Sequence, residues 1–95
     1  MRINGTYQQI HGVEIPAEID LLSAEGLIGK NTPETTRPTL TKLGIQGDPG
    51  TVIIINGNEA VIGKTGIFEL DQVTEITSLI FPNGAESTTL IDYIY

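Results

Sequence analysis

Short apolar runs, separated by turn residues, follow one another along the second half of the chain. Residues 51–55 (TVIII) are mostly β-branched, and such side chains pack well on a pleated sheet. Asn56-Gly57 follows directly, and this dipeptide is typical of a type I′ turn because both residues adopt positive φ at low cost. The pattern therefore predicts a β-hairpin whose return strand is residues 59–62.

A second turn and a third strand continue this stretch. Gly63 and Gly66 bracket the turn, and residues 67–70 (IFEL) are typical of a short strand. Because three strands fall within about twenty residues, we expect them to pair with their neighbours as an antiparallel meander. Residues 53–55 are consecutive isoleucines, so both faces of the first strand are apolar. That strand is either central in a two-layer structure or meets another chain with one face.

A further strand precedes the hairpin. Leu43 and Ile45 alternate with polar or small residues over residues 40–46, which is the pattern of a half-buried strand. The turn after it contains Pro49 and Gly50, which suit the second and third positions of a type II turn. The chain is therefore expected to enter the hairpin through this tight turn.

Two more strands are predicted toward the C-terminus. Residues 73–81 form the first, with mixed polar and apolar faces, and a turn at residues 82–84 ends it. Residues 88–95 form the last strand. One of its faces carries Leu90, Asp92 and Ile94, and the other carries Ile91, Tyr93 and Tyr95. The predicted fold class is all-β, a small antiparallel β-sandwich or barrel of about six strands with an extended N-terminal arm.

The first residues of the chain predict that arm. Ile10, Val13 and Ile15 alternate loosely with polar residues. Pro16 lacks an N–H and is best tolerated at a sheet edge or at a helix start. We therefore expect an extended segment or an edge strand that ends at Pro16.

Residues 17–25 allow two interpretations. Ile19 and Leu22 are spaced for one face of a helix, and acidic residues suit its first turn. Such a helix has about two turns and is marginal without packing. The alternative is an irregular segment that docks through Ile19, Leu21 and Leu22, and both interpretations stay open.

A polar stretch separates this segment from the strands. Residues 30–39 (KNTPETTRPT) carry two prolines and are typical of a linker. A linker of ten residues spans about 33 Å when extended. The predicted organisation is an arm at residues 1–29, a linker at 30–39 and a β-domain at 40–95. The arm then need not pack on its own chain and is expected to clasp a neighbouring subunit.

Composition indicates one small β-rich domain. The chain has 95 residues with 11 glycines, 5 prolines and no cysteine. A chain of this size buries roughly 60–65% of its unfolded surface, so its core is limited. Without disulfides, oligomerisation is an expected source of additional stability.

The net charge of −7 comes from 12 acidic and 5 basic residues. This balance argues against binding of nucleic acid or of an anionic membrane surface, because both need clustered Lys and Arg. No apolar run approaches the roughly 18 residues of a membrane span, and the N-terminus lacks the apolar core of a signal peptide. We expect a soluble protein made in the cytoplasm.

No catalytic or metal-binding constellation is visible. His11 is the one histidine and is expected to be exposed or at a subunit contact, rather than a pH sensor or a ligand. The carboxylates match neither a glycosidase motif nor a calcium loop, although a calcium site built by adjacent loops remains the weaker alternative. Solvated turn and strand positions are expected for Asp48, Glu59, Glu69, Asp71 and Asp92. We therefore predict no enzyme activity, no catalytic residue, no cofactor and no bound metal.

Residues 44–81 carry a series of short motifs. The series is GIQ at 44–46, PGT at 49–51, NG at 56–57, IGKTGI at 62–67, ELD at 69–71 and ITSL at 76–79. It resembles a short domain that recurs in structural genes of tailed bacteriophages and prophages of Gram-positive bacteria. The resemblance implies a β-rich virion module, in the tail or baseplate region, and it carries over no catalytic residue.

The expected function is that of a structural virion protein, in the tail, the baseplate or associated with the capsid, that acts by protein–protein assembly. The expected partners are copies of itself, other virion structural proteins or both, with no nucleic acid and no membrane. Open sheet edges at residues 1–7 or 88–95 would be completed by a neighbour's strand. The expected location is the virion, after synthesis in the host cytoplasm.

A carbohydrate-binding or adhesin module on a fibre tip is the alternative function. Tyr7, Tyr93 and Tyr95 would then stack on sugars, with calcium held by acidic loops. Tyrosines in a core or an interface are the commoner outcome for such residues. The position of Tyr93 therefore discriminates between the two.

Overall fold

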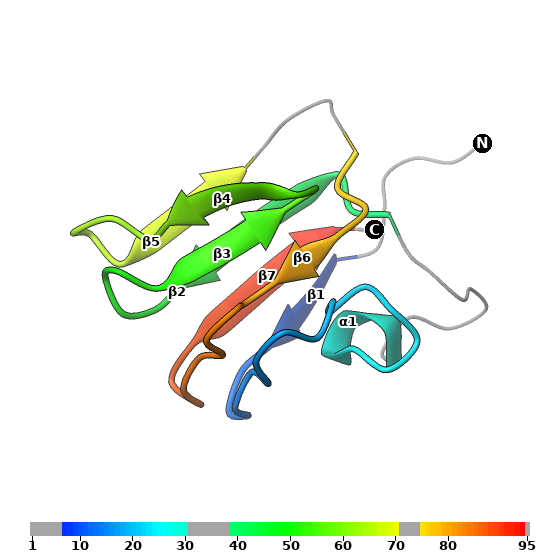
Figure 1. The fold of residues 1–95 in the computed structure, drawn as a ribbon, viewed down its shortest axis with the longest axis horizontal. Coiled ribbons are helices and arrows are strands. Elements are labelled where there is room, and N and C mark those ends of the chain that lie inside the picture. The colour runs from blue at the N-terminus through cyan, green and yellow to red at the C-terminus, as the bar shows by residue number, and fades with distance from the viewer. Residues whose placement is uncertain (1–6, 31–38, 71–74, 95) are drawn as a thin grey trace.

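The computed structural model describes residues 7–30, 39–70 and 75–94, which form two antiparallel sheets packed as a β-sandwich (Figure 1). The four-stranded sheet has the order β1 (Tyr7–Ile10), β7 (Leu90–Ile94), β2 (Lys42–Gln46), β5 (Ile67–Leu70). The three-stranded sheet has the order β4 (Asn58–Val61), β3 (Val52–Ile55), β6 (Leu79–Ile80). The described residues contain one helix, the short α1 (Leu27–Lys30). The all-β sandwich predicted from the sequence is confirmed.

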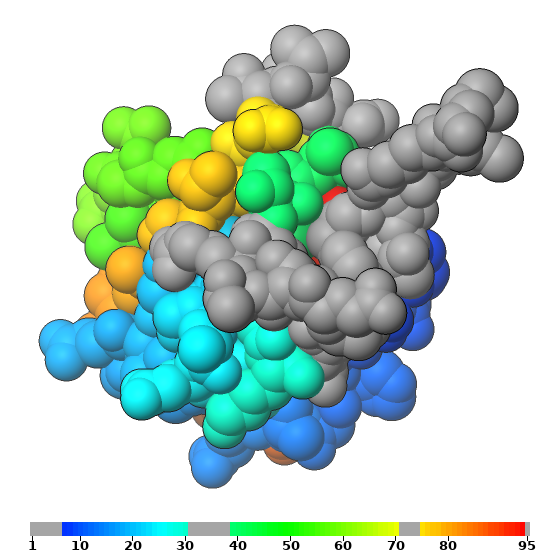
Figure 2. All heavy atoms as spheres, turned by 90° about the vertical axis from the view of Figure 1, so that its right-hand side faces the viewer, coloured from blue at the N-terminus to red at the C-terminus, as the bar shows by residue number. Residues whose placement is uncertain are grey.

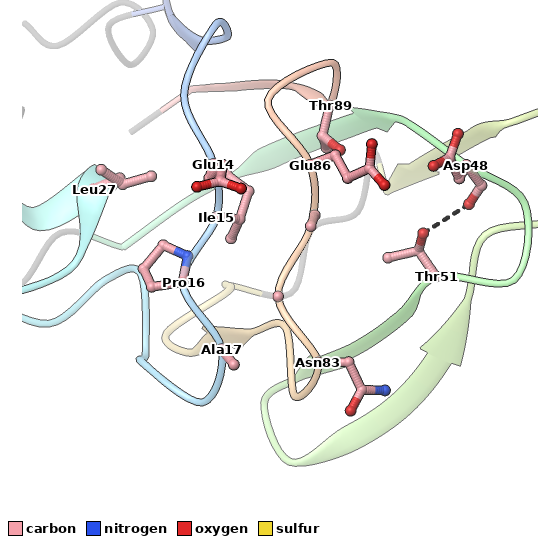
Figure 3. Close-up of a pocket in the computed structure, with 12 residues that line it drawn as sticks. Glu14, Ile15, Pro16, Ala17, Leu27, Asp48, Thr51, Asn83, Glu86 and Thr89 are labelled. Atoms are coloured by element: carbon pink, nitrogen blue, oxygen red, sulfur yellow. Dashed lines mark hydrogen bonds between the residues drawn. The ribbon is translucent and has the colours of Figure 1, made fainter.

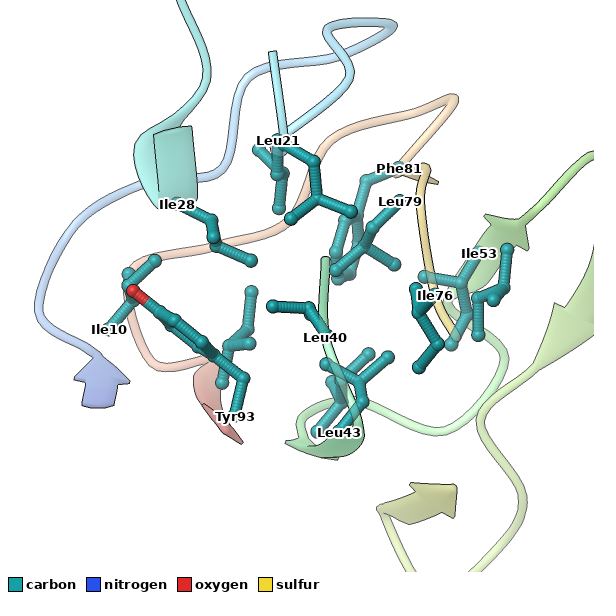
Figure 4. Close-up of a cluster of buried hydrophobic side chains, with 14 of the residues drawn as sticks. Ile10, Leu21, Ile28, Leu40, Leu43, Ile53, Ile76, Leu79, Phe81 and Tyr93 are labelled. Atoms are coloured by element: carbon teal, nitrogen blue, oxygen red, sulfur yellow. The ribbon is translucent and has the colours of Figure 1, made fainter. Parts of the chain in front are cut away.

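The core lies between the two sheets and is made almost entirely of isoleucine and leucine. Ile53 of β3 and Leu43 of β2 are completely buried, and so are Leu79 and Phe81 at the β6 end (Figure 4). Each fully buried side chain of this kind contributes about 1.5–3 kcal/mol relative to an exposed one. Alternation along each strand therefore decides which residues build the core.

The hairpin turn is the one predicted. Asn56 and Gly57 have φ values of 51° and 83°, and Ile55 pairs directly with Asn58. Positive φ at both central residues defines a type I′ turn. The strongest local signal in the sequence thus fixes the register of β3 and β4.

The turn before β3 also has its predicted geometry. The Thr51 amide donates to the Asp48 carbonyl at 3.2 Å, and Gly50 has a φ of 91°, as a type II turn requires. Ile62 then faces two residues, because it donates to Thr51 at 2.9 Å and accepts from Gly50 at 2.8 Å. This is a β-bulge with glycine in its left-handed position, and it ends the β3–β4 ladder.

The predicted meander is wrong in one respect, because β5 pairs with β2 of the other sheet and not with β4. The register runs from Leu43 opposite Leu70 to Gln46 opposite Ile67. After the buried Ile62, the chain turns, and the Gly47 amide donates to the Gly66 carbonyl at 2.9 Å. This bond starts β5 beside the end of β2, so the turn links the two sheets.

The strand predicted over residues 73–81 is much shorter. Only Leu79–Ile80 forms a strand, Ile76 makes a single pair with Leu40, and residues 71–74 lie outside the described chain. The Asn56 amide group explains the interruption: its Oδ1 accepts from Thr77 N at 2.8 Å and Ser78 N at 3.2 Å, and its Nδ2 donates to the Glu75 carbonyl at 3.0 Å. A side chain therefore bonds backbone groups that a strand ladder would otherwise use.

The last strand forms as predicted but is not a sheet edge. β7 lies between β1 and β2, with Ile91 and Tyr93 on its buried face. A strand with neighbours on both sides has no free ladder for another chain, so the expected open edge at residues 88–95 is wrong. Residues 1–6, most of the other expected edge, lie outside the described chain.

Of the two interpretations of residues 17–25, the irregular segment is confirmed and the helix is wrong. Glu18 has a φ of 66°, which a helix does not allow, and its amide donates to the Phe81 carbonyl at 3.0 Å. The Leu21 amide donates to the Leu79 carbonyl at 2.8 Å. The backbone groups of this segment therefore bond to the β6 region, and both Leu21 and Leu22 are fully buried.

The N-terminal segment is extended, as expected, but it packs on its own chain. Ile10, Ile15, Leu21, Leu22 and Ile28 belong to the common core. β1 also pairs with β7 along its whole length. Figure 2 shows the blue-to-cyan N-terminal residues packed directly against orange residues from later in the chain. The expectation that residues 1–29 need not pack on their own chain is thus corrected for the described residues 7–29, because these apolar side chains supply part of the common core. Most of the predicted linker, residues 31–38, lies outside the described residues.

Candidate functional site

A groove of about 730 Å³ lies in the described surface at one end of the sandwich (Figure 3). Three segments that are far apart in the sequence line it: residues 14–17, residues 83–89 and the turn at residues 48–51. We call it the acidic groove, after the carboxylates of Glu14, Asp48 and Glu86 that line it. No sequence motif links these segments, so only the fold brings them together.

Backbone pairing holds the first two segments side by side. The Ile15 amide donates to the Ala85 carbonyl at 2.8 Å, and the Ala85 amide donates back to Ile15 at 3.0 Å. Gly84 ends the turn just before this pair, with a φ of 72°. A Cβ at this position would lie 2.7 Å from the Ile15 carbonyl oxygen, so the close approach of the two segments requires glycine.

The third segment is held by the type II turn described above. The Thr51 hydroxyl donates to the Asp48 carbonyl at 2.8 Å, in addition to the turn's backbone bond (Figure 3). This second bond leaves the Asp48 carboxylate exposed at the rim of the groove. A tight turn therefore fixes the position of an acidic side chain.

The electrostatic character of the acidic groove is uniformly negative. Glu14, Asp48 and Glu86 are all exposed, and each comes from a different wall. No Lys, Arg or His is among the described residues that line it. The polar lining is completed by the Asn83 amide and by threonine hydroxyls, so the groove favours a cation that also donates hydrogen bonds.

Thr89 is the buried polar residue of the groove. It lines the cavity with an exposed fraction of 4%, and its backbone amide donates to the Glu86 carbonyl at 2.9 Å. Its Oγ1 lies 3.3 Å from the position that a Cβ on Gly47 would occupy, which places the hydroxyl near the Asp48 end. Sequence reasoning missed Thr89, although it has the same parity as the inward-facing Ile91 and Tyr93.

Small apolar side chains complete the walls of the groove. They are Ile15, Pro16, Ala17, Leu27 and Ala85. Alkyl chains pack well on such a surface while a charged end group reaches a polar rim. The acidic groove can therefore hold an elongated group that is apolar along its stem and positive at its tip.

The structure does not gather the five carboxylates singled out from the sequence. Asp48 is in the acidic groove, while Glu59 and Glu69 are exposed on edge strands of different sheets. Asp92 lies over Gly44 and accepts from the Tyr7 hydroxyl at 3.2 Å. Asp71 is outside the described residues, within which no group of three His, Cys, Asp or Glu side chains could hold a metal ion.

The aromatic platform that the carbohydrate-binding alternative needs is not present among the described residues. Tyr93 has an exposed fraction of 1% and points into the core, so it cannot stack on a sugar. Tyr7 is on the opposite face of its sheet with an exposed fraction of 54%, and Tyr95 lies outside the described residues. The alternative of a core tyrosine is confirmed for Tyr93. His11 is exposed, which is one of the two placements expected for it.

A second feature is the outward side of the three-stranded sheet. Val52 pairs with Val61, and Ile54 pairs with Ile80, and directly paired residues share a face. These four side chains point away from the core, and we call them the outer apolar face. Val61 has an exposed fraction of 52%, and the other three are partly buried. In Figure 1 no described element lies in front of this sheet.

No protein-family model, no curated protein and no solved structure matches the chain. Among the described residues, no helix combines the length and the apolar character needed to cross a membrane. The acidic groove and the outer apolar face are therefore the two features from which a function can be argued.

Proposed function

We propose that the chain is a structural subunit of a phage or phage-derived particle, that it acts by protein–protein assembly, and that it has no catalytic role. The outer apolar face is the observation that carries this proposal. The motif series in residues 44–81 supplies the setting, a tail, baseplate or capsid-associated position in the virion.

The composition of β3 supports an interface on its outward side. Ile53 and Ile55 point inward and are buried, so these two residues are the contribution of β3 to the core of its own chain. Val52 and Ile54 point outward, where an unassembled protein would normally carry polar side chains. Their presence in a chain with a net charge of −7 favours contact with another protein surface.

A second copy of the chain is the proposed occupant of this face. Two sheets pack face to face about 10 Å apart, with their side chains interdigitated. A stable interface covers about 800 Å² per partner, with an apolar centre and a polar rim. The outer apolar face would form the centre, and the exposed Glu59, which pairs with Ile54, would contribute to the rim.

Light scattering at two protein concentrations tests the proposal. We expect the wild-type chain to form a closed oligomer and Ile54→Lys to be monomeric, with an unchanged circular dichroism spectrum. Ile67→Lys is the matched control, because Ile67 is exposed on the outward side of the other sheet. A wild-type monomer at both concentrations, or an equal loss of mass in both variants, contradicts the proposal.

The alternative of a carbohydrate-binding module is not favoured by any observation on the described residues. Its stacking platform required Tyr93, which is buried. The exposed Tyr7 is engaged with Asp92 and with Gln9, whose Nε2 donates to the Tyr7 hydroxyl at 2.8 Å. The assembly function is therefore the one that we carry forward.

A further inference from the structure

We infer that Asn83 is a site of spontaneous covalent modification, at which the side-chain amide reacts with the backbone nitrogen of Gly84 and becomes a carboxylate. The inference does not depend on the proposed assembly. It rests on a comparison of two Asn-Gly sequences, Asn56-Gly57 and Asn83-Gly84, which share the same chemistry but have different surroundings in the fold.

The reaction joins two neighbouring groups of the chain. The Gly84 nitrogen attacks Cγ of Asn83, so that an N–Cγ bond forms, the nitrogen loses its proton and the Cγ–Nδ2 bond breaks with release of ammonia. Water then opens the resulting cyclic imide at one of its two carbonyl carbons. Opening at Cγ gives aspartate, and opening at the main-chain carbonyl gives isoaspartate, in which the backbone runs through Cβ and Cγ. Glycine in the second position favours the attack because it has no Cβ to hinder the approach.

The side chain of Asn83 is accessible for this reaction. It is exposed, and its amide group takes part in no hydrogen bond among the described residues. In Figure 3 this amide projects from the turn that carries it. The Gly84 amide donates to the Phe81 carbonyl at 2.9 Å, which is the bond of a β-turn with Pro82 and Asn83 at its centre. Local opening of this short turn releases the attacking nitrogen.

The side chain of the other asparagine is held by several bonds. Asn56 is also exposed, so exposure does not distinguish the two sites. Its Oδ1 accepts from Thr77 N at 2.8 Å and from Ser78 N at 3.2 Å, and its Nδ2 donates to the Glu75 carbonyl at 3.0 Å. Cyclisation must first break these three bonds and turn the amide group toward its own backbone. The fold therefore protects Asn56 and leaves Asn83 reactive.

Modification of Asn83 also affects the N-terminal segment. Isoaspartate adds an atom to the backbone just before Gly84, where a Cβ would already lie 2.7 Å from the Ile15 carbonyl oxygen. The next residue, Ala85, exchanges two backbone hydrogen bonds with Ile15, at 2.8 and 3.0 Å. A longer backbone shifts Ala85 relative to Ile15 and weakens this pair. The modification thus loosens, irreversibly, the contact between the N-terminal segment and the loop before β7.

Peptide mapping of the full chain by mass spectrometry tests the inference. Trypsin cleaves after Lys42 and Lys64, so Asn56 and Asn83 are recovered in separate peptides, residues 43–64 and 65–95. During incubation in mildly alkaline buffer, we expect conversion of amide to acid to be about tenfold faster in the second peptide, because the two sites differ in how readily they open. Comparable rates in the two peptides, or a faster reaction at Asn56, overturn the inference.

The same measurement in about 6 M urea separates the effect of the fold from that of the neighbouring sequence. Circular dichroism verifies that the chain is unfolded, and the two rates should then agree within about twofold. A tenfold difference that persists in urea overturns the inference, because the fold would not be its cause. Asn83→Gln should abolish the signal in residues 65–95 of the folded chain, since glutamine would have to form a larger ring. A signal that persists in this variant overturns the assignment to Asn83.

Hydrogen exchange tests the effect on the N-terminal segment. In the isoaspartate form, isolated by chromatography, the Ile15 amide should exchange about tenfold faster than in the unmodified chain, whereas the Ile62 amide, which donates to Thr51, should not change. Asn83→Asp is the matched control, because it carries the charge of the product without the longer backbone, and it should keep the slow exchange of Ile15. Unchanged exchange of Ile15 in the isoaspartate form overturns the loosening of the segment.

Discussion

The outward sides of the two sheets differ in what they offer to their surroundings. On the four-stranded sheet, polar and apolar residues are mixed on the outward side: β2 presents Lys42 and Gln46, whereas β7 presents Leu90 and Ile94. On the three-stranded sheet, the corresponding positions of β3 are Val52 and Ile54. Both sheets obey strict alternation of facing, but polarity alternates along β2 and does not alternate along β3.

The difference separates two kinds of information in a strand sequence. The period of two decides which side chains face the core, and it holds for β2 and β3 alike. The chemical nature of the outward residues reports what the outward side meets, which is water for β2. For β3, apolar residues on that side support the proposed contact with another chain.

The largest expected effect comes from removing the segment that both sheets share. Deletion of residues 1–29 removes Ile10, Ile15, Leu21, Leu22 and Ile28 from the core. At about 1.5–3 kcal/mol each, this loss is comparable to the whole stability of a small domain. We expect no cooperative thermal transition and no strand signal in circular dichroism. A truncated chain that melts cooperatively would show that the two sheets stand without this segment.

Neighbouring isoleucines of β3 provide the next largest contrast. Ile53→Ala should lower the free energy of unfolding by about 2–5 kcal/mol at any protein concentration, because it leaves a cavity in the core. Ile54→Ala should cost less than about 1 kcal/mol in dilute solution, with a larger loss at high concentration, where assembly is linked to stability. Chemical denaturation at two concentrations measures both. Equal, concentration-independent losses would remove the distinction between the two faces.

Asn56 should show an intermediate effect, because it joins the hairpin to the β6 region. Asn56→Ala loses the favoured positive-φ residue and the side-chain bonds to residues 75–78, and should cost about 2–3 kcal/mol. Asn56→Gly keeps the turn but loses the bonds, so it isolates their contribution. The exposed Asn58→Ala is the control in thermal unfolding. If Asn56→Gly matches the wild type, the bonds do not stabilise the sheet.

The smallest effect is expected on the outward side of the four-stranded sheet. A Cβ at Gly44 would overlap the Asp92 carboxylate, which is the end of a side chain that can turn away. Gly44→Ala should therefore change stability by less than about 1 kcal/mol, at the cost of the Tyr7–Asp92 hydrogen bond. A loss well above this value would show that Asp92 is held rigidly, and the double variant with Asp92→Ala would then recover it.

Local signals predicted most strands but not how the strands are shared between sheets. The Asn56-Gly57 turn and the alternation of Leu43 and Ile45 are contained within a few residues, and both were found as expected. The transfer of β5 to the other sheet depends on the bond between Gly47 and Gly66, about twenty residues apart. The apolar residues of the N-terminal segment follow neither a helical nor a strand periodicity. Their packing against the core therefore could not be predicted from the sequence pattern.

The candidate site was less predictable than the fold. Asp48 was singled out, but only as a solvated turn residue, and Glu14 and Glu86 lie in segments that become neighbours through the pairing of Ile15 with Ala85. Such pairing between distant segments has no signature in either one alone. Thr89 could have been identified from the sequence. It lies two residues before the buried Ile91, so alternation in the predicted last strand places it on the same, inward side.

The position of β7 also determines the order in which the chain can fold. This strand pairs with both β1 and β2. Tyr7 cannot pair with Ile94, nor Leu43 with Tyr93, until the end of the chain has been synthesised. The β3–β4 hairpin can close within microseconds from local contacts, whereas the four-stranded sheet requires residues from both ends of the described chain. During synthesis, β1 therefore lacks its only strand neighbour among the described residues until the last strand is available, whereas β2 can already pair with β5. That interval is when this chain is most prone to associate with the wrong partner.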